Sequence, residues 1–159
     1  MTDDARYTDG AEAPLSLGAA TAEDLQVLSA LVQDAVLTGG DIAWDRRGRR
    51  LTFLLNRFRW EDRAAADRQR RPYERVRSLL VIDDVMGVAS QGVNRGDADT
   101  ILSILALAWQ PGEAGTGRVE IVLAGDGAIA AKAECLNVTL RDVTRPYAAP
   151  SGKAPGHPE

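Results

Sequence analysis

The chain has 159 residues, of which 45% are hydrophobic, and a formal net charge of -4 at pH 7. This length is typical of a single domain and is sufficient to bury a core without metals or disulfide bonds. The single cysteine, Cys135, excludes an intrachain disulfide. The N-terminal residues are acidic, unlike a signal peptide, and no apolar run approaches the roughly 20 residues that span a bilayer. We therefore expect a cytoplasmic protein with no membrane segment.

The charge is distributed unevenly along the chain. Residues 1–45 carry nine acidic residues and one arginine, and residues 46–77 carry twelve arginines and four acidic residues. Residues 78–159 carry ten acidic and six basic residues, so the three segments have net charges of -8, +8 and -4. Such asymmetry can mark an anion-binding surface. It also arises when oppositely charged segments neutralise each other across neighbouring strands, and the modest total charge favours this second interpretation.

The two ends of the chain look different from its middle. Residues 1–13 lack apolar periodicity, which predicts a flexible acidic arm. Residues 144–159 contain four prolines and predict a disordered tail. We therefore expect one globular domain over residues 14–143. It begins with Leu15 and Leu17, which alternate with polar residues as in a short edge strand.

A helix is expected over residues 22–34. Thr21 can accept a hydrogen bond from the first turn, and the acidic residues after it suit the positive end of a helix. Five apolar residues then fall on one helical face, which predicts packing against the core: Leu25, Leu28, Leu31, Val32 and Ala35.

The central stretch, residues 49–61, holds both phenylalanines and lies in the basic region. A short strand at 41–44 and a tight turn at 45–48 precede it. Its apolar residues change parity at Asn56: Leu51, Phe53 and Leu55 come before it, and Phe58 and Trp60 after it. Because a strand shows alternate residues on opposite faces, this change predicts a bulge or bend near residues 55–57.

The Arg-rich residues 62–73 predict a long exposed loop or a short frayed helix. Residues 74–82 and 85–91 are rich in Val, Ile and Leu, and Asp83 and Asp84 between them predict a hairpin turn. Residues 100–109 are apolar on all sides, so their periodicity fits a buried strand or a buried helix, with the strand ahead.

Gly125-Asp126-Gly127 is a strong hairpin signal. Residues 128–135 alternate after it, and the apolar parity changes again at Leu136, which predicts a second bend. Together the patterns predict an α+β fold, with one N-terminal helix packed on a curved, mostly antiparallel β-sheet of about seven or eight strands. A two-sheet sandwich or a barrel-like closure would also fit, because closing a sheet removes its exposed edges.

The sequence contains no recognisable catalytic or metal-binding constellation. The single histidine, His157, lies in the tail, which argues against a His-based triad or a His-bearing zinc site. Cys135 is interpreted as a small buried hydrophobe. Residues 94–99 are similar to an acidic calcium loop but lack the glutamate expected at its twelfth position. The glycines of 112–117 have the wrong spacing for a dinucleotide site. We therefore predict no metal and no cofactor.

The segment 56–77, named here the Arg-aromatic segment, is the remaining site candidate. Arginines can hold phosphates through paired hydrogen bonds, and aromatic rings can stack on bases. The candidate binding residues are Asn56, Arg57, Arg59, Trp60, Arg63, Arg68, Arg70 and Arg71.

Three functional hypotheses follow from this segment. The leading one is a non-enzymatic interaction module that forms a homo-oligomer or binds a protein partner. The first alternative is binding of nucleic acid or another polyanion through the Arg-rich loop. The second is a small-molecule-binding protein or an enzyme with carboxylate chemistry, which would require a deep pocket.

Three short segments also carry a family resemblance: Thr-Ala-Glu-Asp-Leu at 21–25, Leu-Leu-Asn-Arg-Phe-Arg-Trp-Glu at 54–61, and Glu-Cys-Leu at 134–136. Together they resemble an uncharacterised bacterial domain-of-unknown-function family of about this length, found mainly in alphaproteobacteria. The resemblance covers roughly residues 14–147, and residues 56–61 are its most specific part. It implies a single domain and supplies no catalytic residues.

Overall fold

The computed structural model describes residues 14–93 and 97–156. The arm expected at residues 1–13 and His157 lie outside the described residues, as does part of the loop at 94–99. Within the described residues the fold is α+β, as the sequence predicts. Most of it is one antiparallel sheet, accompanied by two α-helices, α2 (Ala22–Val32) and α3 (Arg63–Gln69).

Over the described residues the sheet has eleven strands, of which nine follow one another in the order β1-β10-β5-β4-β2-β7-β8-β9-β6. Strand β11 pairs with β5, and β3 pairs with β4. The bounds are β1 (Ser16–Ala19), β2 (Val36–Thr38), β3 (Ile42–Asp45), β4 (Arg50–Phe58), β5 (Glu74–Ile82), β6 (Val85–Gln91), β7 (Ile101–Pro111), β8 (Gly117–Leu123), β9 (Ala128–Ala133), β10 (Val138–Asp142) and β11 (Tyr147–Ala148). The sheet is not closed, since β1 and β6 stand at opposite ends of this order.

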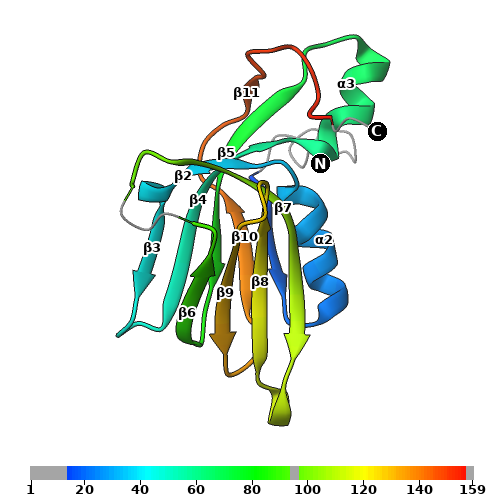
Figure 1. Ribbon diagram of the computed structural model, residues 1–159. Coiled ribbons are helices and arrows are strands. Elements are labelled where there is room, and N and C mark those ends of the chain that lie inside the picture. The colour runs from blue at the N-terminus through cyan, green and yellow to red at the C-terminus, as the bar shows by residue number, and fades with distance from the viewer. Residues whose placement is uncertain (1–13, 94–96, 157–159) are drawn as a thin grey trace.

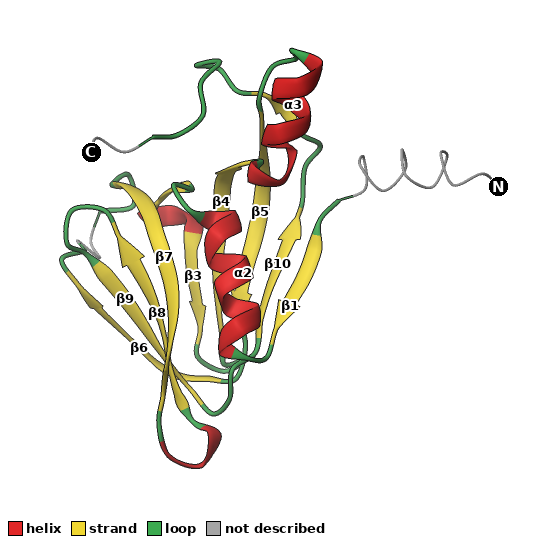
Figure 2. Cartoon of the chain, turned by 90° about the vertical axis from the view of Figure 1, so that its right-hand side faces the viewer, coloured by secondary structure: helices red, strands yellow, loops and turns green. Residues whose placement is uncertain are grey.

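The short strand β2 divides the sheet into two halves that face each other (Figure 1). One half contains β1, β10, β5, β4 and β3, and the other contains β7, β8, β9 and β6. Helix α2 packs against β7 and β1 and lies along one side of the two halves (Figure 2). The Ser29 hydroxyl of this helix accepts a hydrogen bond from the Leu107 N–H at 2.9 Å, next to an irregularity in the β7–β8 register.

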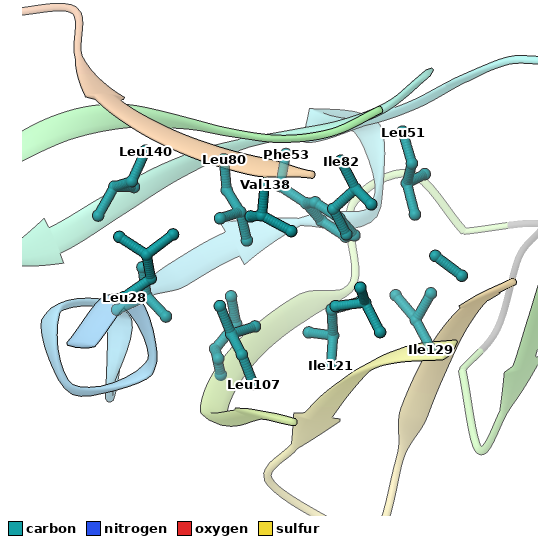
Figure 3. Close-up of a cluster of buried hydrophobic side chains, with 14 of the residues drawn as sticks. Leu28, Leu51, Phe53, Leu80, Ile82, Leu107, Ile121, Ile129, Val138 and Leu140 are labelled. Carbon is teal, nitrogen blue, oxygen red and sulfur yellow. The ribbon is translucent and has the colours of Figure 1, made fainter. Parts of the chain in front are cut away.

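The core lies between the two halves. Side chains from both halves and from α2 point toward one another (Figure 3). Phe53, Leu80 and Ile121 are fully buried there. Alternation produces this core, because Phe53 and Leu80 are register partners on the inner faces of β4 and β5.

The strongest local patterns of the sequence are confirmed. Helix α2 begins after Thr21, whose side chain accepts a hydrogen bond from the Asp24 N–H. Residues 101–111 form a strand, and β8 and β9 form a hairpin across Gly125-Asp126-Gly127. In that turn Gly125 and Asp126 adopt positive φ angles of 81° and 66°.

The prediction of a hairpin between residues 74–82 and 85–91 is wrong. Both edges of β5 are occupied by β4 and β10, so β6 pairs with β9 in the other half. Asp83 and Asp84 instead form a crossover between the halves. A second crossover at 134–137 runs beside it, where the Asp83 N–H donates to the Asn137 carbonyl.

Neither change of apolar parity produces a β-bulge. Strand β4 keeps an unshifted register with β5 through Phe58, so the bulge expected at 55–57 is absent. The parity change at Leu136 follows the end of β9 and lies in the crossover to β10. Cys135 lies in this crossover and is exposed, so its interpretation as a buried hydrophobe is also wrong. Its thiol donates to the Asp84 carboxylate at 3.3 Å.

The domain extends beyond the expected boundary at residue 143. Residues Tyr147–Ala148 form β11 on the edge of β5, and Ala149 is buried. Part of the stretch for which the sequence predicts a disordered tail thus pairs with residues 74–75 of β5. Among the residues that the structure describes, no helix has the length and apolar character needed to cross a membrane.

A close backbone approach at Gly117 provides a test of the packing. A Cβ atom at this position would lie 2.5 Å from the Gln110 carbonyl oxygen and 2.5 Å from the Trp109 ring. We predict that Gly117→Ala lowers the free energy of unfolding by about 1–3 kcal/mol in urea denaturation. Gly87→Ala is the control, because its Cβ would meet nothing within 4 Å. Its effect should stay within about 1 kcal/mol, and equal effects of the two variants would contradict this packing.

Candidate functional site

The Arg-aromatic segment begins on the inner face of the sheet. Leu51, Phe53, Leu55 and Arg57 alternate along β4, and all four are buried. Because the register does not shift, Arg57 takes the next core-facing position after Leu55. A guanidinium therefore occupies a position where alternation predicts an apolar residue, and its side chain is completely buried.

The Arg57 guanidinium is satisfied by three side chains. Its Nη1 and Nη2 atoms donate to the two Glu61 carboxylate oxygens at 2.9 and 2.8 Å. Nη2 also donates to Asp142 Oδ1 at 2.9 Å, and Nε donates to Ser78 Oγ at 3.0 Å. Burial would lower the pKa of Arg57, but the Glu61 and Asp142 carboxylates outweigh it and raise this pKa.

Asp142 connects Arg57 to the edge of the sheet. Its Oδ1 atom also accepts from the Ser78 hydroxyl at 2.7 Å, and its Oδ2 atom accepts from the Leu15 N–H at 3.0 Å. The contacts therefore join β4, β5 and β10 to the residue that precedes β1. We name Arg57, Glu61, Ser78 and Asp142 the buried ionic cluster.

A second network lies in the turn that follows β4. Arg71 donates from two nitrogens to both Asp62 carboxylate oxygens, each at 2.6 Å. Arg59 pairs with Glu74, and one of its nitrogens lies 3.8 Å from Asp62. Two acidic residues thus bridge two arginines. The hydrogen bond from Arg71 lowers the pKa of Asp62, and the charge of Arg59 adds to this effect.

The aromatic rings of the segment pack on one another. Phe58 is fully buried, with ring centroids 4.7 Å from Trp60 and 5.6 Å from Tyr73 in edge-on arrangements. The Trp60 indole N–H donates to the Gln33 carbonyl at 3.0 Å, at the end of α2. The rings of Trp60 and Tyr73 therefore pack around Phe58 at the end of β4, so that Phe58 is buried without a bulge.

Helix α3 contains three consecutive alanines, which favour helix formation, and Ala66 is its buried contact. It ends at Arg70, which has a left-handed φ of 53° and is followed by Pro72 after one residue. Arg63, Arg68 and Arg70 are exposed, and no ion pair among the described residues includes them. The Arg63 guanidinium lies 5.9 Å from the Trp60 ring centroid.

The predicted site residues therefore divide into two groups. Asn56, Arg57, Arg59, Trp60 and Arg71 are engaged in internal contacts, with Asn56 accepting from Arg75 through its side chain at 2.7 Å. The exposed arginines of 63–70 form the other group. Arg57, Arg59 and Arg71 pair with acidic residues of their own segment and with Asp142, and within the described residues none of these ion pairs involves residues 14–45.

Sequence reasoning missed the acidic partners of these arginines. Glu61 and Asp62 lie four and three residues after Arg57 and Arg59, a spacing that could have indicated the pairs. Asp142 is 85 residues from Arg57, and no local pattern points to it. Among residues 14–93 and 97–156, no group of three His, Cys, Asp or Glu side chains could hold a metal ion.

The buried ionic cluster makes a direct prediction for Arg57→Leu. The substitution would leave the buried Asp142 carboxylate without its cation. Breaking one side of a buried pair costs about 3–5 kcal/mol, and we expect a loss of this size in the free energy of unfolding. Arg68→Ala, on the exposed side of α3, should change this energy by no more than about 0.5 kcal/mol. Similar urea midpoints for the two variants would contradict the prediction.

The second network predicts a pH effect at Asp62. Because its pKa lies below the ordinary 3.8 in the folded state, the unfolded chain takes up the proton first as pH falls. The stability that Asp62 contributes is thus present above pH 3.8 and is lost as pH falls through its folded pKa. We predict that the stability difference between wild type and Asp62→Asn is constant above about pH 5 and shrinks as the pH falls from about 4.5 to about 2.5. A difference that stays constant in urea titrations across this range would contradict it.

Comparison with known proteins gives a family for this chain. The searches of curated proteins and of solved structures found no match. The family model described as "Protein of unknown function (DUF2948)" matches residues 15–157. This match spans nearly all of the described fold, including β1, both ionic networks and β11. The chain therefore belongs to the DUF2948 family of proteins of unknown function.

Proposed function

We propose that the protein is a non-enzymatic interaction module that binds an acidic surface of a partner protein through the exposed arginines of α3. The observation that carries this proposal is a division within the Arg-aromatic segment: Arg57, Arg59 and Arg71 form internal ion pairs, whereas Arg63, Arg68 and Arg70 are exposed together on α3 and at its end. Helix α3 stands apart from the two half-sheets in both views (Figures 1 and 2). A partner can therefore approach it without contacting the core.

The internal contacts support this role by holding α3 in place. Asp62 is the residue before α3 and is clamped by Arg71, which follows its end. Trp60 anchors the preceding turn to α2. A surface that is fixed before binding loses less conformational entropy when it meets a partner.

A protein partner fits the site better than a nucleic acid. Proteins that bind single strands offer aromatic rings on which bases can stack. Here Phe58 is buried, and Trp60 and Tyr73 pack edge-on against it. Three exposed arginines would also neutralise few phosphates, in a chain whose net charge is -4.

Self-association through this same surface is less favourable than a heterologous contact. In a two-fold dimer the same patch contacts itself, so the arginines of two copies would face each other. Like charges placed opposite one another oppose binding.

We also propose a cytoplasmic location. It is supported by the single cysteine, Cys135, whose thiol is exposed and unpaired in a disulfide, since disulfides are rare in reducing compartments.

The test compares two triple variants that change the net charge equally. Arg63→Ala, Arg68→Ala and Arg70→Ala together remove the α3 surface. Three exposed pairs at about 0.5 kcal/mol each are equivalent to roughly a tenfold loss of affinity. We predict this loss for a fluorescent oligoglutamate peptide, measured by anisotropy at low ionic strength.

The matched control combines Arg47→Ala, Arg141→Ala and Arg145→Ala, three exposed arginines outside the segment. It should change peptide affinity less than twofold. Equal losses in both triple variants would overturn the proposal, because the binding would then reflect net charge alone. Tighter binding of a DNA oligonucleotide with the same number of charges would replace the protein partner with a nucleic acid.

A further inference from the structure

The space between the two half-sheets differs on its two sides: a helix fills one side, and a cavity lies on the other. Helix α2 packs against both β1 and β7 on one side. On the other side, residues of β3 and β6 line a cavity of about 420 Å³. Its volume lies within the range of about 300–1,000 Å³ that is usual for small-molecule sites.

Most of the cavity lining is apolar, because the strand register directs apolar side chains of β3 toward the core. Ile42 and Trp44 of β3 pair with Phe53 and Leu51 of β4, which are core residues, so both point inward. Leu51 and Ile129 line the cavity and are only 1% and 4% exposed. Water against these apolar side chains gains few hydrogen bonds, and the apolar part of a ligand can displace it favourably.

Backbone hydrogen bonds fix one rim of the cavity. Gly39 begins a short 3-10 turn (Gly39–Asp41), and its N–H donates to the Thr100 carbonyl at 3.0 Å. Gly40 donates in the same way to Ala98 at 2.9 Å. A Cβ at Gly39 would lie 2.7 Å from the Asp97 carbonyl oxygen, so the two segments touch through their backbones. The rim is therefore held in place without a ligand.

Two charged residues, Arg46 and Asp97, also line the cavity, and they differ in their availability. The Asp97 carboxylate accepts from the Asp99 N–H at 2.9 Å, and the hydroxyl of Thr100 also hydrogen-bonds to it. Arg46 lies in the turn after β3, is exposed, and takes part in no ion pair among the described residues. Arg46 is therefore a cation of the lining that can pair with an anionic group of a ligand.

We propose that this cavity binds a small amphipathic carboxylate. The apolar body of the ligand fills the space between β3 and β6, against Trp44 and Ile129, and its carboxylate pairs with Arg46. At about 30 Å³ for each water-sized atom, the volume accommodates on the order of a dozen non-hydrogen atoms. A guanidinium suits a carboxylate because it can donate two parallel hydrogen bonds. This site is separate from α3 and does not depend on the function proposed for it.

The test uses three ligands with the same alkyl chain and different head groups: decanoate, 1-decanol and decylamine. Calorimetric titration of the wild-type protein should give the tightest binding for decanoate. Arg46→Gln should weaken decanoate about tenfold and leave 1-decanol unchanged. Arg47→Gln, the neighbouring exposed arginine that does not line the cavity, should change neither affinity.

A second variant tests the apolar part of the site. Val88 of β6 lines the cavity and is half-buried, so Val88→Trp places a large ring in the open space. This variant should lose decanoate and 1-decanol alike, with circular dichroism confirming the fold. If Val88→Trp does not fold, the effect of Arg46→Gln on decanoate affinity still tests the proposal. Equal affinity of decanoate and 1-decanol for the wild type, or no effect of Arg46→Gln on decanoate, would overturn the proposal.

Discussion

A buried guanidinium on the inner face of β4 is the constraint on which this structure depends. Arg57 lies at a core position, so its charge must be neutralised inside the domain. Asp142 from β10, Ser78 from β5 and Glu61 from the following turn provide the hydrogen bonds. The ends of three strands are thereby fixed to one another. Because Asp142 also binds the Leu15 N–H, the entry to the edge strand β1 depends on the same charge.

This constraint determines how the basic region is used. Local ion pairs neutralise much of the positive charge of residues 57–75. They belong to the buried ionic cluster and to the second network, which joins Arg59, Asp62, Arg71 and Glu74. The remaining exposed charge is concentrated on α3, which these contacts hold in position. The segment therefore combines arginines that stabilise the fold with a cationic surface on α3. The acidic and basic segments of the chain do not need to neutralise each other directly.

The sequence predicted those parts of the fold that rest on local patterns. Helix α2 has a 3.6-residue periodicity and a capping Thr21, and the β8–β9 hairpin has its Gly-Asp-Gly turn. Pairings that depend on distant strands were missed: β5 lies between β4 and β10, and so leaves β6 to pair in the other half. Asp142 could not be assigned to Arg57 because no pattern links positions 85 residues apart. The cavity lining comes from β3, β4, β6 and β9, which meet only in the folded chain, so the sequence carries no local sign of it.

A double-mutant cycle on Arg57 and Asp142 tests the central claim most directly. Arg57→Leu, Asp142→Leu and the double variant would be compared with wild type by urea denaturation. If the pair is the buried link between β4 and β10, the double variant should be more stable than the sum of the single losses predicts. We expect a coupling free energy of about 2–3 kcal/mol, at the upper end of the range for contacting residues. A coupling below about 0.5 kcal/mol, the additivity of independent sites, would contradict the claim.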